Sequence, residues 1–397
     1  MANSIRLELI LNVGALLFFL GIYTILPFLS RYAVSLGATP EEVSLLGPAL
    51  SIAAIGLRPL SGFLLDRGYL KKLIVAGLLC STTAQIIYSI SPNVAILYLG
   101  RILHGVGSAF FIPASIYTAA LAGKGSTSAL AWRSTMIGIA MVLGPAIGGF
   151  ITSSLGYQWL FYASCAMLLA SLTFHQLVLG KIKGGAEGGK GTVRDLVEAS
   201  FIAASLSILC YSAIYNSITL YLPALHEELG IAVGITATAF TASSVANLAS
   251  RLIFPIICKK VPFRITALLG FVLVTLSAVS IVANPASGYL VLWMVVFGLG
   301  AGVIIPSLQI MAVLGVKDKS RGLASGFYTA MFDAGNIVGP PLVMSLGASY
   351  MGALKATLVF PTTGSLVLLF FSTYMLLSGR NKVVLDGAPT LNTPHKA

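Results

Sequence analysis

The sequence predicts an all-α membrane protein whose twelve transmembrane helices form two pseudo-symmetric six-helix bundles. Hydrophobic residues make up 57% of the 397 positions and charged residues only 9%, a composition too apolar for a protein that covers its surface in water. The apolar residues gather in unbroken runs of about 20 residues or more, long enough to cross about 30 Å of hydrocarbon as helices. Such runs exclude a β-barrel, whose strands alternate apolar and polar residues. Short motifs of the first half recur in the second.

Each expected span is an apolar run bounded by a short polar or basic connector. Helices are expected because a spanning segment must satisfy its backbone polar groups internally. In chain order, we expect Leu9–Leu29, Val43–Leu65, Leu73–Ile90, Val94–Leu121, Thr135–Ser154, Tyr157–Leu179, Ala199–Leu222, Ile235–Ile257, Thr266–Ala283, Leu290–Val313, Leu323–Leu346 and Ala356–Leu377.

The distribution of basic residues predicts the orientation of these spans. When the connectors are assigned alternately to two sides, nineteen Lys and Arg residues fall on one side, and only Arg31 and Lys355 fall on the other. Such an excess is typical of cytoplasmic connectors. We therefore expect both termini to be cytoplasmic, in a plasma membrane or a bacterial or archaeal inner membrane. The net charge of +12 is spread among connectors, so we interpret it as a topology signal and expect no nucleic-acid partner.

The predicted domain organisation follows from an internal repeat. A shift of 193 residues places RPLSGFLLDRGYLKK at 58 on RLIFPIICKKVPFRI at 251, and GVGSAFFIP at 105 on GLGAGVIIP at 298. The segment GKIKGGAEGGKGTVRD is rich in glycine and basic residues, which is typical of a flexible linker. We expect a first bundle at 1–180, a cytoplasmic linker at 181–196, a second bundle at 197–379 and a cytoplasmic tail at 380–397.

Four motifs along the chain resemble those of one transporter family. They are LGIYTILP in the first span, GFLLDRGYLKK after the second, LYLGRILHGVGSA in the fourth and GPAIGG in the fifth. In this order they resemble the motifs of the major facilitator superfamily, and within it the twelve-helix proton-coupled drug exporters. The resemblance covers essentially the whole chain. It implies the major facilitator fold, with a substrate site near the membrane midplane between the two halves.

The loop after the second span is the expected gate. The resemblance implies that Asp66 pairs with nearby cations, and Arg133 at the start of the fifth span is a candidate partner. Gly62, Arg67 and Lys71 occupy matching positions of the same motif. We also expect the small side of the helix at Gly62 to let a neighbouring helix approach closely.

The loop also departs from the family pattern. Tyr69 and Leu70 stand where the pattern has a glycine and a basic residue. The gate is therefore expected to differ in detail. For Lys71 and Lys72 the alternative is that they only set the topology of the second span.

Three polar residues inside spans are candidates for proton coupling. Arg101 lies within the fourth span, where an unpaired cation costs several kcal/mol, so it either takes part in coupling or snorkels to the interface. His104 follows on roughly the same face and either titrates or packs as a neutral histidine. Asp333 is the single carboxylate near the middle of a span, and it either couples transport to a cation or proton or forms a structural ion pair with an arginine. Arg58 and Arg251, which the repeat aligns, contact helix ends or the opposite gate element, or else snorkel.

The fifth and eleventh spans carry expected bends. Proline removes a hydrogen bond from the helix, and neighbouring glycines let helices pack closely in spite of the bend. The residues of this helix-bend motif are Gly144, Pro145, Gly148 and Gly149 in the fifth span, and Gly339 and Pro340 in the eleventh.

Polar or amphipathic residues inside spans are candidates for substrate contacts. Each of them is also compatible with ordinary packing or with a position at the membrane interface. They are Tyr23, Tyr211, Tyr215, Asn216, Asn247, Gln309 and Asn336.

The sequence therefore predicts a secondary active transporter that exports an amphipathic small molecule by alternating access, as a proton antiporter and as a monomer. One alternative is an importer or facilitator of a small metabolite on the same fold. Another is a membrane sensor or scaffold that does not transport. An enzyme, a bound cofactor and a metal site are not expected, because no cluster has the spacing of a nucleophile with a base or of metal ligands.

Overall fold

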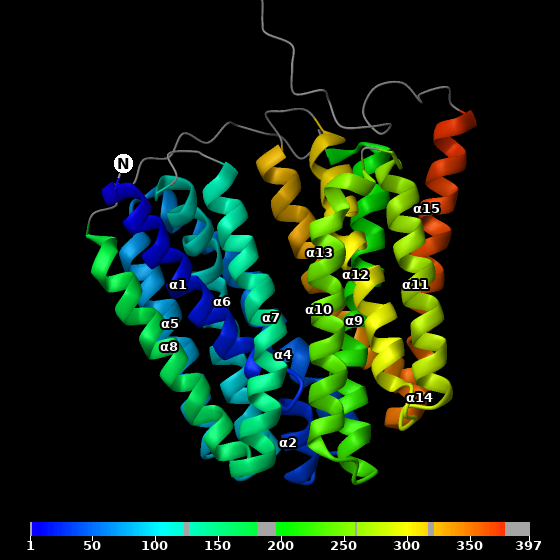
Figure 1. Cartoon of the computed structure of the whole chain (residues 1–397), viewed down its shortest axis with the longest axis horizontal. Helices are drawn as coiled ribbons and strands as arrows, with labels where there is room; N and C mark the ends of the chain where they lie inside the picture. Colours follow the sequence, from blue (N-terminus) through cyan, green and yellow to red (C-terminus); the bar gives the residue numbers. More distant parts are fainter. Residues whose placement is uncertain (1, 123–126, 181–195, 259, 317–320, 378–397) are drawn as a thin grey trace, which may run out of the picture.

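The computed structural model describes residues 2–122, 127–180, 196–258, 260–316 and 321–377. Within these ranges the chain is helical, and Figure 1 shows the helices standing roughly side by side. Their bounds are α1 Ala2–Ile25, α2 Leu29–Ser35, α3 Pro40–Ser44, α4 Leu46–Asp66, α5 Leu70–Ser89, α6 Val94–Ala122, α7 Thr127–Leu155, α8 Tyr157–Leu179, α9 Ala199–Glu228, α10 Val233–Ile257, α11 Phe263–Ala283, α12 Leu290–Leu314, α13 Arg321–Gly347, α14 Tyr350–Ala356 and α15 Val359–Leu377.

Three of the expected spans consist of two helices each. The first was predicted to run without a break from Leu9 to Leu29, but α1 ends at Ile25 and α2 begins at Leu29. Pro27 lies in the turn between them and has no N–H to continue the helix. The second span likewise begins with the short helix α3, which precedes α4. The twelfth consists of α14 and α15 and begins at Tyr350, six residues before the expected Ala356.

Ten segments of the described chain are long and apolar enough to cross a membrane. They correspond to ten of the expected spans, and the remaining two spans are the long helices α10 and α13. These two helices also line the contact between the halves, where α10 packs on α7 and α13 packs on α4. Helices that face other helices tolerate polar residues better than helices surrounded by lipid, which accounts for their lower apolarity. Together the twelve segments fit the predicted all-α membrane fold.

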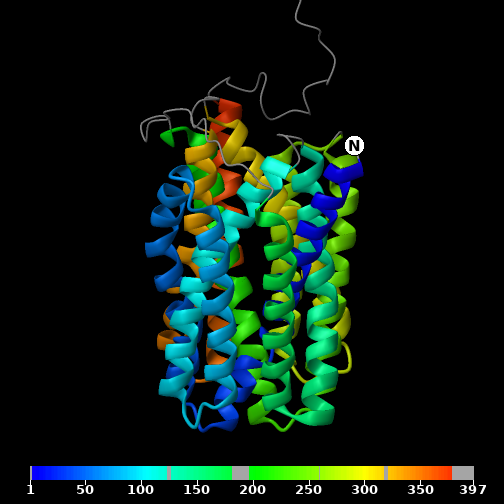
Figure 2. The same ribbon diagram turned by 90° about the vertical axis from the view of Figure 1, so that its left-hand side faces the viewer.

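Two groups of helices lie next to each other. Helices α1–α8 form the first half, and helices α9–α15 form the second half; Figures 1 and 2 show them from two directions. The repeat is visible in their backbone contacts. Gly105 faces the carbonyl oxygen of Leu50, and Gly298 faces that of Ser243, so both members of the contact are displaced by 193 residues. The same displacement relates the contact Gly77–Gly107 to Gly270–Gly300. The predicted pseudo-symmetry is therefore present in the packing.

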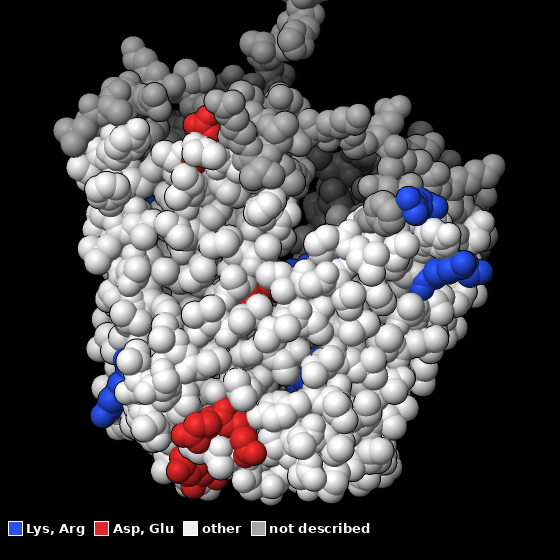
Figure 3. Space-filling view, turned by 180° about the vertical axis from the view of Figure 1, so that it is seen from behind, with Lys and Arg blue, Asp and Glu red and all other residues white. Residues whose placement is uncertain are grey.

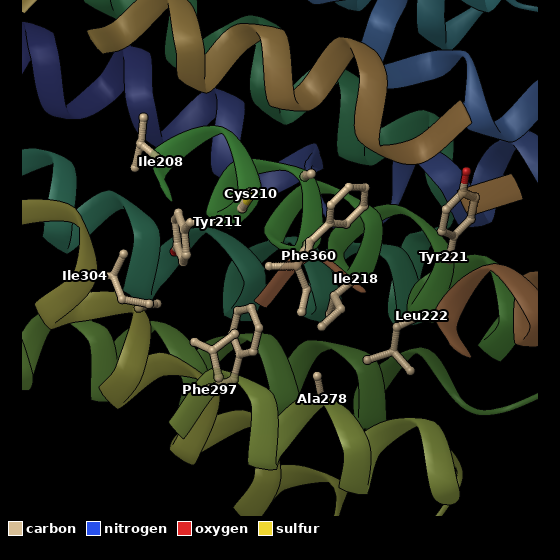
Figure 4. Packing of buried hydrophobic residues seen from close by; sticks show 14 of the residues in the cluster. Ile208, Cys210, Tyr211, Ile218, Tyr221, Leu222, Ala278, Phe297, Ile304 and Phe360 are labelled. Atoms are coloured by element: carbon tan, nitrogen blue, oxygen red, sulfur yellow. The ribbon is translucent and has the colours of Figure 1, made fainter. Parts of the chain in front are cut away.

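The second half has a large apolar core around α9. Figure 4 shows side chains of this core, including Tyr211 and Tyr221 from α9 and Phe297 from α12. Tyr221 is fully buried, and its hydroxyl donates a hydrogen bond to the carbonyl oxygen of Pro340 at 2.6 Å. That carbonyl belongs to α13, so the bond joins two of the helices that border the first half.

The two ends of the bundle differ in charge. Lys71 and Lys72 follow α4 at the end where the chain begins, which we call the basic end. The opposite end, which we call the acidic end, carries Glu41 and Glu42 on α3 and Glu227 at the end of α9. Figure 3 shows the acidic side chains gathered at this end on one face of the molecule, whereas the middle of the face carries few charges.

Candidate functional site

Ion pairs join the two halves at two levels. Arg31–Glu227 and Arg58–Asp333 each connect the first half to the second. Buried charges away from water require partners, so these contacts mark where the halves are held together.

The first pair belongs to a hydrogen-bonded cluster at the acidic end. Arg31, on α2, has only 4% of its side chain exposed. Its Nε donates to Glu227 Oε2 at 2.7 Å, and its two terminal nitrogens donate to Thr236 Oγ1 at 2.9 Å and to the Ile231 carbonyl oxygen at 2.8 Å. One guanidinium of the first half therefore holds three acceptors of the second.

Two further side chains support this cluster. Tyr157 of α8 donates its hydroxyl to Glu227 Oε2 at 3.1 Å. His226 is fully buried, with Nε2 3.1 Å from the Pro285 carbonyl oxygen and Nδ1 2.8 Å from Thr236 Oγ1. Because a carbonyl can only accept, Nε2 donates, which leaves Nδ1 of a neutral imidazole to accept from Thr236. We call Arg31, Tyr157, His226, Glu227 and Thr236 the Arg31 latch.

The second pair lies nearer the middle of the bundle. Arg58 of α4 binds Asp333 of α13 through a terminal guanidinium nitrogen. Next to it, Asn336 Nδ2 donates to Ser51 Oγ at 2.6 Å. We call these four residues the middle bridge. Of the alternatives open for Asp333, the structure has the ion pair with an arginine, and Arg58 contacts the opposite half rather than snorkelling.

Two small cavities lie between the helices near the middle bridge. One, of about 40 Å³, is lined from both halves and includes Arg101, Asn216 and Asn336. The other, of about 20 Å³, is lined mainly by the second half and includes Tyr215 and Asn247. A drug-sized ligand needs roughly 300–1,000 Å³. Each of these two cavities is therefore too small for such a ligand in this conformation.

The expected substrate residues fall into three positions. Asn216, Asn336, Tyr215 and Asn247 line these cavities. Tyr23 and Tyr211 lie within electrostatic range of Arg251, which itself donates from Nε to Asn247 Oδ1 at 2.8 Å. Gln309 is exposed and lines neither cavity.

Arg101 and His104 are buried inside the first half. Arg101 is 7% exposed, and its Nε donates to the carbonyl oxygen of Leu46 on α4 at 2.7 Å. A buried guanidinium with this partner does not snorkel. His104 Nδ1 lies 3.4 Å from the hydroxyl of Tyr88, and its Nε2 has no hydrogen-bond partner in the described chain. A coupling role for the two residues stays a prediction.

The gate residues are described only in part. Asp66 ends α4, and its side chain lies outside the described part of the structure. Arg67 and Lys71 are exposed at the basic end. A Cβ placed at Gly62 would meet no described atom within 4 Å, and a close helix approach there stays a prediction.

Arg133 is the exception among the gate candidates because it is buried. It is 8% exposed on α7, and its Nε donates to Ser115 Oγ at 2.9 Å. Its guanidinium carbon also lies 5.4 Å from the centre of the Phe19 ring, within range of a cation–π interaction. Both contacts stay within the first half, and a pairing with Asp66 stays a prediction.

The glycines of the helix-bend motif bring helices into close contact. A Cβ at Gly144 would lie 2.6 Å from the backbone of Tyr23, and one at Gly148 would collide with the carbonyl oxygen of Thr24. Gly149 faces Ala237 of α10 across the two halves. On α13, Gly339 packs on Ala213 of α9. The helices α7 and α13 continue without interruption through Pro145 and Pro340.

The sequence interpretation did not assign a role to the Arg31 latch. Arg31 was used only as one of two basic residues on the less basic side. Its position beside acidic segments at Glu41, Glu42, Glu227 and Glu228 was the available signal. Arg31 is one of only two basic residues expected on that side of the membrane, and a buried cation there requires a counter-charge. The acids of the same side can supply it.

The chain matches a family model over nearly its whole length. The model is described as Major Facilitator Superfamily and matches residues 11–340 and 201–394. The chain belongs to the Major Facilitator Superfamily. It is therefore a multi-pass membrane protein of a transporter family for small molecules, and the predicted recognition and fold class are confirmed.

Individual members show how similar the chain is to known proteins. It is 26% identical over 343 residues to Multidrug resistance protein 2 of Bacillus subtilis (strain 168), covering 82% of this chain and 84% of that protein. It is 27% identical over 160 residues to Quinolone resistance protein NorA of Staphylococcus aureus (strain MRSA252), covering 40% and 41%. A crystal structure of a mutant of the nucleoside transporter NupG superposes with a TM-score of 0.77 at 15% identity, covering 92% and 99%.

Proposed function

We propose that this member of the Major Facilitator Superfamily exports an amphipathic small molecule as a proton antiporter, by alternating access. The names of its relatives support export, since they are called drug resistance proteins. We place the basic end and both termini in the cytoplasm of a plasma membrane or a prokaryotic inner membrane, on the excess of basic residues. The protein acts as a monomer in this proposal, with the gate residues Gly62, Asp66, Arg67, Lys71 and Arg133 on the cytoplasmic side.

The middle bridge is the observation that carries the proposal. Asp333 is 10% exposed, lies inside α13 and binds a cation of the other half. A proton on Asp333 removes the negative charge, and Arg58 then has no anionic partner at this level of the described structure. Protonation therefore weakens a contact whose breaking is required for the halves to separate. This links the uptake of a proton to the conformational change of the transporter.

The other candidate residues take supporting roles in this mechanism. The small cavities that include Asn216, Tyr215 and Asn247 widen to admit substrate when the halves separate. Arg101 and His104 lie one turn apart on α6, and Arg101 borders one of these cavities, so we place them beside the proton path. The tightly packed glycines of α7 and α13 keep these helices against their neighbours as each half moves.

The test compares Asp333→Asn with Asp333→Glu in proteoliposomes. A fluorescent quinolone serves as the probe, after the name of one relative, and a pH-sensitive dye reports proton movement. We expect Asp333→Asn to reduce proton-coupled movement of the probe at least tenfold and Asp333→Glu to retain much of it. Glu41→Gln, at an exposed acid of the acidic end, is the matched control and should behave as the parent protein.

Other results would overturn parts of the proposal. Coupled transport at the parent rate in Asp333→Asn would place the coupling acid elsewhere. Inward movement of the probe together with protons would establish an importer. Folded protein that moves neither probe nor protons in any gradient would favour the sensor or scaffold.

A further inference from the structure

Arg251 is a cation inside α10, six residues before the helix ends at Ile257, without an anionic partner among the described residues. It lies on α10, about one turn from Leu248, which packs on Gly138 of α7. Its guanidinium therefore lies on the side of α10 that faces the first half. Asp333 is the single acid in the middle of a span, and it is already bound to Arg58. A cation at this depth is costly to bury unless a counter-charge is supplied.

The guanidinium of Arg251 is held by one edge only. Asn247, one turn earlier on α10, accepts a hydrogen bond from Nε at 2.8 Å. Within the described residues this is its single hydrogen bond. The two terminal nitrogens, which can bind both oxygens of a carboxylate at once, are thus left for another acceptor.

Tyrosines from three helices are electrostatically coupled to this guanidinium. Tyr23 of α1, Tyr211 and Tyr215 of α9 and Tyr328 of α13 all lie within electrostatic range of Arg251. Tyr328 donates to the Ile305 carbonyl oxygen at 3.2 Å. No hydrogen bond joins the hydroxyls of Tyr23 and Tyr211 to a described residue, so each keeps a donor for a ligand within electrostatic range of the cation.

Aromatic rings continue from this cluster into the smaller cavity. The rings of Tyr211 and Tyr215 stack at 5.9 Å between centroids, and those of Tyr215 and Phe297 stack at 6.5 Å. Figure 4 shows Tyr211 and Phe297 projecting from α9 and α12 within one core. The cavity is lined by Tyr215, Phe297 and Asn247, together with the flexible side chains of Met141 and Met294. Methionines adapt their shape, so this wall can widen around a ring.

We propose that Arg251 binds the anionic group of the substrate and that the substrate is an amphipathic aryl carboxylate. The carboxylate takes the two terminal nitrogens of Arg251 and the hydroxyls of Tyr23 and Tyr211. The ring enters between the helices at Tyr215 and Phe297, and Asn247 fixes the guanidinium while it borders the ring site. This inference rests on the proposed transport function and adds the charge of the substrate, because the one acid at this depth is paired and the free charge is positive.

Three probes of the same shape and different charge test the inference. They are 2-naphthoate, 2-naphthylmethylammonium and 2-naphthalenemethanol, added to the purified full-length protein in detergent at neutral pH. Binding is measured by calorimetry and by the thermal unfolding temperature, which rises when a ligand binds the folded state. We expect 2-naphthoate to bind at least tenfold more tightly than the other two. Equal or tighter binding of the ammonium, or no binding of 2-naphthoate at millimolar concentration, would overturn the inference.

Variants then locate the bound anion. Arg251→Gln should weaken binding of 2-naphthoate at least tenfold and leave binding of the neutral alcohol unchanged, whereas Arg251→Lys should retain part of the affinity. Lys72→Gln removes an exposed cation of the basic end and should leave all three affinities as they are. If Arg251→Gln does not fold, Tyr211→Phe replaces it and should weaken 2-naphthoate about threefold. Unchanged 2-naphthoate binding in a folded Arg251→Gln protein would contradict the assignment.

Binding and transport fail in different ways. The binding assay needs no gradient and no sealed membrane. Protein that binds 2-naphthoate through Arg251 but transports nothing would contradict the proposed function and keep the anion site. Protein that exports the ammonium probe with protons would keep the proposed function and reject the anion site.

Discussion

The Arg31 latch and the middle bridge both join the two halves, but they are built differently. In the latch one guanidinium donates to three acceptors and has 4% of its side chain exposed. Tyr157 and His226 add further hydrogen bonds around it. The middle bridge has one ion pair and one hydrogen bond, from Asn336 to Ser51, and Arg58 has 28% of its side chain exposed. The latch is therefore the more extensive contact, and the bridge is the one that a single proton can break.

This difference separates two tasks of an alternating transporter. A multiply bonded contact holds one end closed against thermal opening, because all its hydrogen bonds must be lost together. A contact that depends on one carboxylate responds to its protonation. The acidic end is thus suited to set which conformation is populated, and the middle is suited to sense the coupling ion.

Removing Arg31 should have the largest effect. Arg31→Ala leaves Glu227 without its cation and removes three hydrogen bonds, so we expect the free energy of unfolding to fall by about 3 kcal/mol or more. Thermal or denaturant unfolding of the purified protein measures this loss. In membranes, Thr236→Cys placed in the Arg31→Ala background should react faster with a membrane-impermeant maleimide, because the acidic end opens.

The control for this prediction is Glu41→Gln, at an exposed acid of the same end that is not part of the latch. It should change stability by less than about 0.5 kcal/mol. Parent-like stability and labelling in Arg31→Ala would show that the latch does not hold the halves.

A matched pair of glycines tests the packing at the same two levels. Gly149, near the latch, faces the short and rigid side chain of Ala237, whereas Gly138, nearer the middle, faces the end of the flexible Leu248 side chain at 2.8 Å. Gly149→Ala should therefore destabilise the protein by about 2 kcal/mol through overpacking, and Gly138→Ala by less than about 1 kcal/mol. Comparing the two unfolding temperatures checks the order. A larger loss of stability in Gly138→Ala than in Gly149→Ala would contradict the expectation that the packing near the latch is the more rigid of the two.

Removing Arg58 should have the smallest effect on stability. Arg58 has 28% of its side chain exposed, and Asp333, when it loses its cation, can take up a proton instead of staying charged, so the loss is smaller than for Arg31. We therefore expect Arg58→Gln to lower the free energy of unfolding by about 1 kcal/mol while changing proton-coupled transport far more. Denaturant unfolding, together with the proteoliposome assay, measures both quantities. If Arg58→Gln lowered the stability as much as Arg31→Ala, the latch and the middle bridge would not differ in how strongly they hold the halves together.

The fold could be predicted from the sequence because the patterns that indicate membrane spans lie within short stretches of the chain. Long apolar runs and the contrast between basic and apolar segments define spans without knowledge of any contact. The repeat was also readable, and it reappears as Gly105–Leu50 and Gly298–Ser243 in the packing. The break after Ile25 was missed because the apolar run continues through Pro27, and hydropathy does not register a lost hydrogen bond.

The partners of charged residues could not be predicted from spacing. Arg58 and Asp333 are 275 residues apart in the chain, and Arg31 and Glu227 are 196 apart, so only the folded halves bring them together. The residue types were informative about chemistry, whereas the pairings depend on how the two halves meet.

The turn between α1 and α2 works as an elbow. On the α1 side of the turn, Tyr23 and Thr24 pack tightly against Gly144 and Gly148 of α7, so α1 must move together with α7. Beyond it, α2 carries Arg31 to the opposite half. The first membrane span therefore has two parts: α1 packs on the first half, and α2 binds the second half. Only residues Leu26 to Phe28 connect these two parts. If the acidic end opens, the backbone from Leu26 to Phe28 must bend, while α1 stays packed against α7.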